Sequence, residues 1–356
     1  MCRKRSLHGA EQLRTTRGAW LVLSAILVAL CSQRGAAAEG LQAIELAARK
    51  EGEVTWYVAS IDKYNAEAAG NAFAVTYGIK ANVVQAPTQV MFQRLTHDLS
   101  QSARKADVFS SVDIGNFVKL KEQGALMAYK PENAAMLLPA FQNLDKDGMF
   151  HATTASAIAI VYNIRALTAD EAPHDWTGLL DPKWANRIAL VHPAFSVFAG
   201  NWAAQMNKQY GKSYFYRLSE LKPHISRSPL EAVNLVASGE RHVAVVPIAP
   251  AMEQADQGKP LAVRHPTDGS ILVTTPSAIL QSAQHPNAAK LFIEFLMGPK
   301  FGALQVRRRF EAMRADVKPL SGTEPLTNIK LRRPTIDEAT NGIVQAAEVW
   351  RTVFGK

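Results

Sequence analysis

The chain has 356 residues, of which 47% are hydrophobic and 20% charged, and its formal net charge is +9. These proportions are ordinary for a globular protein, and they exclude a fibrous or largely disordered chain. The length predicts about two domains, each long enough to bury a core of normal size.

The first 38 residues predict a secretory signal peptide. A basic head is followed by the uncharged run GAWLVLSAILVAL (18–30) and then by three alanines at 36–38. This order is typical of a leader with a small-residue cleavage site, so we expect cleavage after Ala38 and a periplasmic mature chain. The alternative is an uncleaved anchor, for which the apolar run is short.

Removing this leader changes both the charge and the cysteine content. The leader holds six of the 40 Lys and Arg and one of the 31 Asp and Glu, which leaves 34 against 30 and a net charge of +4. The mature charge therefore gives no indication of nucleic-acid binding. Cys2 and Cys31 both lie in the leader, so the mature chain has no disulfide, thiolate metal site or cysteine nucleophile.

Strand-like runs alternate with helical patterns along the mature chain. Strands are predicted at 53–60, 106–111, 151–163, 187–193, 223–226, 242–246 and 269–280. Helices are predicted at 88–101, 115–124, 196–211, 229–238 and 286–298. The alternation predicts an α/β fold with largely parallel sheets, arranged as a two-domain hinged clamshell. We expect domain I to comprise 39–155 plus 276–325, and domain II 156–275 plus 326–356.

Four segments resemble the bacterial extracellular solute-binding proteins of ABC importers, and among these the ferric-iron-type group. They are APHDWTGLLDPKWANRIAL (172–190), AQHPNAAKLFIEFLMGPKFGALQ (283–305), DGMFHATTASAIAIVYN (147–163) and TDGSILVTTPSAI (267–279). The resemblance covers nearly the whole mature chain in the expected order. It implies a type II periplasmic-binding fold, a ligand held in the interdomain cleft, and delivery of that ligand to a membrane permease.

Candidate ligand contacts lie where predicted strands end, because ligands of open α/β sheets meet the carboxyl ends of strands. Ser60 and Tyr64 follow the first strand, and Ser110 and Ser111 end the second. Their hydroxyls could donate hydrogen bonds to a substrate oxygen. The alternative for each serine is local capping of the next helix.

The second half of the chain offers four further candidates. His192 and Ser196 precede a helix whose first turn has no acidic residue, so an anion could bind there, although packing and routine capping explain them equally. Arg227 stands before the predicted capping residue Ser228 and could hold a carboxylate or phosphonate, or form a surface salt bridge. Ile248 lies in PIAP (247–250), which we expect to be a loop forming a wall of the cleft.

PIAP also bears on whether iron is the ligand. In the family's iron binders, a pair of adjacent tyrosines follows the strand that corresponds to HVAVV. Here those positions fall at about Ala249 and Pro250, which have no phenolate, and no two tyrosines are adjacent elsewhere. We therefore expect a small organic anion, such as a carboxylate, phosphonate or sugar phosphate, and no metal ligand or cofactor. Ferric iron or an iron chelate is the alternative.

The predicted role is that of a substrate-binding component of an ABC transporter. Its expected partners are a small solute and an ABC permease in the inner membrane, and the chain is expected to be a monomer that does not bind nucleic acid. The sequence has no Gly-x-Ser-x-Gly elbow, His-Glu-x-x-His helix or Gly-rich phosphate loop, so no catalytic residue and no enzymatic activity are predicted. An exported enzyme and a sensory module on the same fold remain as alternatives.

Overall fold

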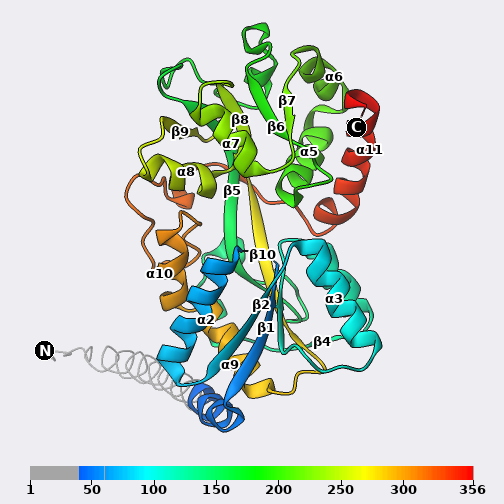
Figure 1. Cartoon of the computed structure of the whole chain (residues 1–356), viewed down its shortest axis with the longest axis vertical. Helices are drawn as coiled ribbons and strands as arrows, with labels where there is room; N and C mark the ends of the chain where they lie inside the picture. The colour runs from blue at the N-terminus through cyan, green and yellow to red at the C-terminus, as the bar shows by residue number, and fades with distance from the viewer. Residues whose placement is uncertain (1–39, 60, 356) are drawn as a thin grey trace, which may run out of the picture.

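The computed structural model describes residues 40–59 and 61–355, so the predicted leader and Ser60 lie outside the described residues. Two α/β lobes are stacked along the long axis, and the long strands β5 (His151–Asn163) and β10 (Ser270–Leu280) run between them (Figure 1). This is the two-domain α/β architecture predicted from the sequence. In the described part of the chain, no helix has the length and apolar character needed to cross a membrane.

The lower lobe in Figure 1, called lobe I, contains the first strands of the chain and two late helices. It begins with a helix at 40–51. Its strands are β1 (Glu53–Val58), β2 (Lys80–Gln85), β3 (Val108–Ser110) and β4 (Leu126–Met127). Its helices are α2 (Lys63–Tyr77), α3 (Thr88–Ser100), α4 (Ile114–Glu122), η1 (Glu132–Met136), η2 (Pro139–Phe141), α9 (Pro286–Leu296) and α10 (Pro299–Arg307).

The upper lobe, called lobe II, contains the middle of the chain and the last helix. Its strands are β6 (Ile188–Val191), β7 (His224–Ser226), β8 (Val243–Pro247) and β9 (Leu261–Arg264). Its helices are η3 (Thr177–Leu180), η4 (Pro182–Trp184), α5 (Val197–Tyr210), α6 (Lys212–Glu220), α7 (Pro229–Ala237), α8 (Ile248–Asp256) and α11 (Ile343–Phe354). The short elements η5 (Leu326–Asn328), β11 (Leu331–Arg332) and η6 (Glu338–Gly342) lead into α11.

One continuous sheet runs through both lobes in the order β2-β1-β3-β10-β5-β8-β6-β7. Strand pairs β1–β2 and β1–β3 in lobe I, and β6–β7 and β6–β8 in lobe II, are parallel, as predicted. The crossing strands β5 and β10 pair with each other in antiparallel register, with a shift between Thr275 and Pro276. A proline has no N–H to donate to the ladder, so an irregularity at this point is expected.

Helices cover the sheet of each lobe on both faces, which explains why these strands are rich in buried apolar residues. In lobe I, one core contains Trp56 and Phe292, and the opposite face has a separate core around Phe117. In lobe II, one core is built around Trp202, and the other contains Val233. In each lobe the two cores thus lie on opposite faces of the sheet, and the crossing strands β5 and β10 contribute residues to them. The domain boundaries expected from the sequence stay a prediction.

A third connection, the return segment (residues 333–342), contacts both lobes on its way to α11. Ile336 and Ala339 pack against the core of lobe I that contains Phe117. On the side of lobe II, the Glu338 carboxylate pairs with Lys208 and accepts a 2.9 Å hydrogen bond from the amide of Gln205. No sequence pattern predicted that this segment would contact both lobes.

Candidate functional site

The cleft between the lobes holds a cavity of about 740 Å³ that is lined by both of them. Lobe I contributes residues that follow β1, β2 and β3, lobe II contributes residues that follow β6, and the end of the return segment and the start of α11 complete the wall. The lining residues are Ala59, Pro87, Thr88, Gln89, Val90, Asp113, Gly115, Lys119, Pro193, Ala194, Phe195, Ser196, Val197, Ala339, Thr340, Asn341, Ile343 and Val344. Carboxyl ends of strands from both lobes therefore meet at this cavity, as the fold predicts.

Helix N-termini from opposite lobes lie at this cavity. Helix α3 begins at Thr88 and helix α5 follows its capping residue Ser196, and neither helix has an acidic residue in its first turn. Their free N–H groups and positive dipole ends favour an anion. Helix α4 differs, because the Asp113 carboxylate already accepts a 2.9 Å hydrogen bond from the backbone N–H of Gly115. Burial raises the pKa of Asp113.

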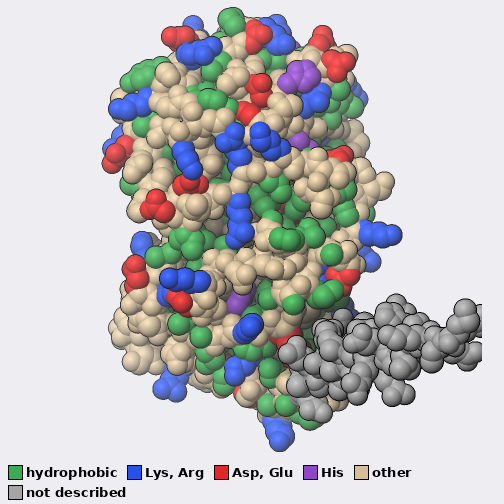
Figure 2. Space-filling view, turned by 180° about the vertical axis from the view of Figure 1, so that it is seen from behind, with side chains coloured by type: hydrophobic (Ala, Val, Ile, Leu, Met, Phe, Trp, Pro, Cys, Tyr) green, Lys and Arg blue, Asp and Glu red, His purple; other side chains and the backbone are tan. Residues whose placement is uncertain are grey.

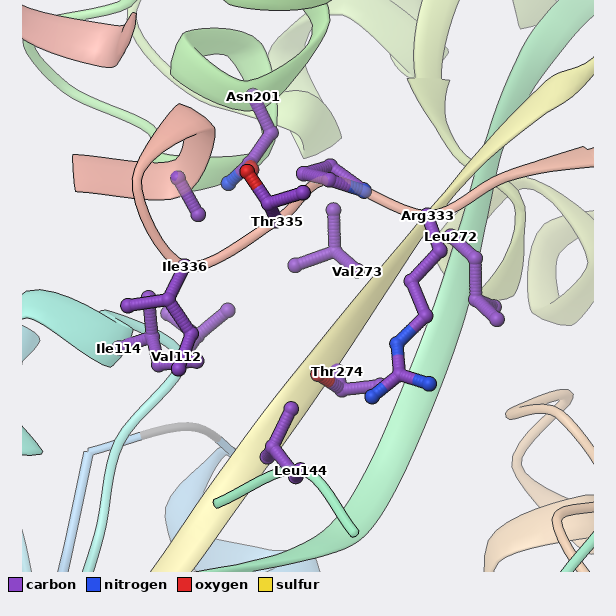
Figure 3. Close-up of a pocket in the computed structure, with 12 residues that line it drawn as sticks. Val112, Ile114, Leu144, Asn201, Leu272, Val273, Thr274, Arg333, Thr335 and Ile336 are labelled. Atoms are coloured by element: carbon purple, nitrogen blue, oxygen red, sulfur yellow. The ribbon is translucent and has the colours of Figure 1, made fainter. Parts of the chain in front are cut away.

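A second cavity of about 260 Å³ adjoins the first at Ala339 and lies over strand β10. Most of its lining side chains are apolar (Figure 3). Its polar lining consists of Thr274, Asn201, Thr335 and the single charged residue Arg333. None of these four residues was predicted from the sequence, because no local motif marks them and they come together only in the folded chain.

The predicted serines of lobe I have different surroundings. Ser60 lies outside the described residues. The buried Ser111 hydroxyl accepts hydrogen bonds from the backbone N–H of Asp113 and the amide of Asn116, at 3.2 and 3.3 Å. The Ser110 hydroxyl is engaged in the core between Trp56 Nε1 at 2.7 Å and the Ser277 hydroxyl at 2.5 Å. Ser111 thus stabilises the turn after β3 and Ser110 stabilises the core beside it, and their roles as ligand contacts stay predictions.

Tyr64 and Ile248 do not line either cavity. Tyr64 is exposed on α2, and the Arg308 guanidinium lies 4.9 Å from the centre of its ring. Ile248 is buried in a small cluster with Ala157 and Ala159 of the crossing strand β5. Both contacts are structural, and a ligand role for either residue stays a prediction.

His192 and Ser196 lie at the start of α5, as predicted. The Nδ1 atom of His192 accepts a 3.1 Å hydrogen bond from the backbone N–H of Ala194, and its ring lies 5.0 Å from that of Phe195. Ser196 caps the helix, with its hydroxyl 3.4 Å from the N–H of Ala199, and lines the large cavity. Ser196 is thus the one predicted site residue in the described chain that also lines the large cavity.

Arg227 is exposed just before α7. Its backbone N–H donates a 2.8 Å hydrogen bond to the Glu231 carboxylate, and the Ser228 hydroxyl accepts one from the N–H of Glu231. The hydrogen bond from Arg227 lowers the pKa of Glu231. The first turn of α7 therefore already contains a carboxylate, which leaves its N-terminus less attractive to a second anion than that of α5.

PIAP is not the loop that we expected. Pro247 ends β8, and Ile248, Ala249 and Pro250 form the first turn of helix α8. A proline is compatible with that turn because the first N–H groups of a helix have no partner within the helix. In residues 40–59 and 61–355 no group of three or more His, Cys, Asp or Glu side chains that could hold a metal ion is found.

Comparison with known sequences adds a family to this geometry. The family model for bacterial extracellular solute-binding proteins matches residues 103–333. The chain is 27% identical over 311 residues to the major ferric iron-binding protein of Neisseria gonorrhoeae, which covers 80% of this chain and 89% of that protein. It is 21% identical over 240 residues to an uncharacterized protein of Haemophilus influenzae, with 65% and 69% covered.

Solved structures show the same fold. The structure of iron-bound HitA from Pseudomonas aeruginosa matches with a TM-score of 0.73 and 19% identity, over 85% of this chain and 99% of that chain. The periplasmic binding protein AfuA from Actinobacillus pleuropneumoniae, with fructose-6-phosphate bound, matches with a TM-score of 0.71 and 20% identity over 85% and 99%. Proteins with different ligands therefore share this architecture, and the fold alone does not select between them.

Proposed function

Because this chain belongs to the family of bacterial extracellular solute-binding proteins, we propose that it captures a small organic anion between its lobes and delivers it to an ABC permease. The observation that supports an anionic ligand is the net positive charge of the residues that line the two cavities. Their lining contains the cations Lys119 and Arg333 and the single carboxylate Asp113. Two helix N-termini without an acid in their first turns add to this positive character.

Ser196 is the predicted ligand contact that the geometry favours most in lobe II. Its backbone lies at the N-terminus of α5, where unpaired N–H groups can donate to a carboxylate or phosphonate. Thr88, at the N-terminus of α3, lines the same cavity from lobe I. The positive ends of these two helices favour an anionic ligand in the cleft, and a ligand held there would contact both lobes, which is what a closing clamshell requires.

Iron remains the second candidate, because one relative is named a ferric iron-binding protein and one similar structure is iron-bound. The side chains at the start of α8 argue against direct coordination of iron. Ala249 and Pro250 stand where the resemblance places the tyrosine pair, and neither side chain can coordinate a hard cation. A ferric chelate with an anionic surface is the form of iron that the positive lining would favour.

A thermal-shift screen of the chain from residue 39 onward tests the proposal. The probes are carboxylates, phosphonates, sugar phosphates, amino acids, polyamines and ferric citrate. A ligand at 100 times its Kd adds about 2.7 kcal/mol to the free energy of unfolding. We expect a single anionic class to stabilise the protein. Stabilisation by a cation or polyamine alone would contradict the anion assignment.

Two further measurements separate this role from its alternatives. A receptor releases its ligand chemically unchanged, so mass spectrometry of the released ligand distinguishes it from an exported enzyme. Loss of uptake when the permease is deleted distinguishes transport from sensing. Light scattering of the purified protein checks the expected monomer, and cell fractionation checks the expected periplasmic location.

A further inference from the structure

The backbone on both sides of Arg333 is held in place, which fixes where its side chain can reach. Just before it, Leu331 and Arg332 pair in parallel register with the first two residues of β10. Just after it, Pro334 restricts Arg333 to an extended backbone. From this position the guanidinium extends along β10 toward Thr274 in the small cavity (Figure 3).

Arg333 has no carboxylate to balance it. No carboxylate lines the small cavity, and no hydrogen bond or salt bridge from the Arg333 side chain to another described residue is present. Two other largely buried arginines differ: Arg309 pairs with Asp256, and Arg314 with Asp316. Partial removal from water lowers the pKa of Arg333, which still leaves it charged at neutral pH. A cation in this setting favours binding of an anion, with which it can form two parallel hydrogen bonds.

Most of the remaining lining of the small cavity is apolar. The apolar lining residues are Val112, Ile114, Leu144, Leu272, Val273, Pro334, Ile336 and Ala339. The volume of about 260 Å³ has room for on the order of eight water-sized groups. A hydroxyl placed against these side chains would lose its hydrogen bonds to water without gaining others, which costs free energy.

Few polar side chains line this cavity, and two of them already form hydrogen bonds within the protein. The Asn201 amide N–H donates a 2.9 Å hydrogen bond to the backbone oxygen of Val197, and the Thr335 hydroxyl accepts one from the N–H of Glu338. Both residues face the cavity from the side opposite β10 in Figure 3. The cavity is thus suited to one charged head and one apolar body, and poorly suited to a polyhydroxylated sugar.

We propose that Arg333 and this cavity form a subsite for an amphipathic monoanion: an aromatic, branched or medium-chain carboxylate whose head binds Arg333 and whose body packs on Ile114 and Ile336. This inference rests on the proposed function and names the substrate class for it. The charge agrees with a monoanion, since Arg333 and Lys119 against Asp113 leave one positive charge around the joined cavities.

Titration calorimetry on the chain from residue 39 tests this assignment. The probes are phenylacetate, 4-methylpentanoate and hexanoate, with phenylacetamide, fructose 6-phosphate, inorganic phosphate and ferric citrate for comparison. We expect an apolar carboxylate to bind and its neutral amide to bind at least 10-fold more weakly. Arg333→Met should weaken carboxylate binding 10- to 100-fold, and Arg333→Lys should weaken it less. Arg351→Met, at an exposed position on α11, is the matched control and should bind like wild type.

The outcomes separate this inference from the function on which it rests. Unfolding in urea checks that Arg333→Met is folded. The proposed subsite is wrong if fructose 6-phosphate or ferric citrate binds and the apolar acids do not. It is also wrong if Arg333→Met binds an apolar acid as tightly as wild type. In both cases the solute-binding role stands. If no probe here or in the wider screen binds wild type, the proposed function fails as well.

Discussion

The guanidinium of Arg309 donates hydrogen bonds to both carboxylate oxygens of Asp256, at 2.8 and 2.5 Å, and so joins lobe I to lobe II. Arg309 follows α10 and Asp256 ends α8, and the two helices face each other across the lobe boundary in Figure 1. The side chain of Arg309 is only 8% exposed, and it also donates to the backbone oxygen of Ser321 and the hydroxyl of Thr323. The neighbouring Arg308 adds a longer salt bridge, of 3.7 Å, to Glu253, which also lies on α8.

Asp256→Asn should lower the stability of the protein. The change leaves the nearly buried Arg309 guanidinium without its negative partner, and hydrogen bonds to charged groups contribute about 1.5–3 kcal/mol each. Because Asp256 is partly exposed, we expect a loss near the lower end of that range in urea unfolding. Glu240→Gln removes the exposed partner of Arg241 and is the control, with little expected change. An Asp256→Asn protein as stable as the control would show that this ion pair does not hold the lobes together.

The buried carboxyl group of Glu311 should make the stability of the protein depend on pH. Burial raises the pKa of its carboxyl from 4.5 to about 7, although the N–H of Ala157 donates a 3.2 Å hydrogen bond to it. Between these two pH values the folded chain binds a proton that the unfolded chain has lost. Stability from this group is therefore complete below about pH 4.5 and is lost as pH rises to 7. The loss is on the order of 3 kcal/mol.

Glu311→Gln should remove this dependence. Compared with wild type, the variant should gain stability progressively from pH 5 to pH 8, measured by thermal unfolding across that range. Glu348→Gln, at an exposed position on α11, is the control and should follow wild type. A constant difference between Glu311→Gln and wild type at every pH would mean that Glu311 does not titrate in this range.

Arg227→Ala tests the prediction from the sequence that the Arg227 side chain, which lines neither cavity of the cleft, contacts the ligand, and it should leave folding intact. The side chain is exposed, and the hydrogen bond to Glu231 comes from the backbone, which alanine retains. If the guanidinium holds the anion, affinity for the ligand found by screening should fall 10- to 100-fold, the value of one or two charge-assisted hydrogen bonds. The urea midpoint should stay that of wild type. Arg217→Ala on α6 is the control, and equal affinity of both variants would refute the role of Arg227.

Addition of ferric nitrilotriacetate should produce no visible tyrosinate–iron band. Ala249 and Pro250 offer no phenolate, and several tyrosine hydroxyls donate hydrogen bonds inside the lobes: that of Tyr129 to Glu294 and that of Tyr214 to the backbone oxygen of Trp176. Burial raises the pKa of both hydroxyls, which disfavours the phenolate form. HitA, which has been solved with iron bound, is the positive control. Colour from this chain would establish direct coordination.

The sequence by itself determined the α/β class, most strands and the helices α3, α4, α5, α7 and α9, because these follow from local periodicity and from helix caps. The strand at 151–163 and the helix that begins after Ser228 were predicted at their observed positions. Helix α8 was missed because the two prolines of PIAP resemble a loop, and only the geometry of a first helical turn shows that they fit there.

Only the tertiary structure decided which residues meet in the cleft. Arg333 is separated from Val112 by more than half of the chain, and it reaches the cavity because β11 pairs with β10 and the return segment crosses between the lobes. No local pattern encodes that pairing. Likewise, Ser110 was a candidate because it ends a strand, but the side of the strand on which its hydroxyl lies depends on packing against Trp56 and Ser277. Local interactions thus set the elements, and long-range packing sets the site.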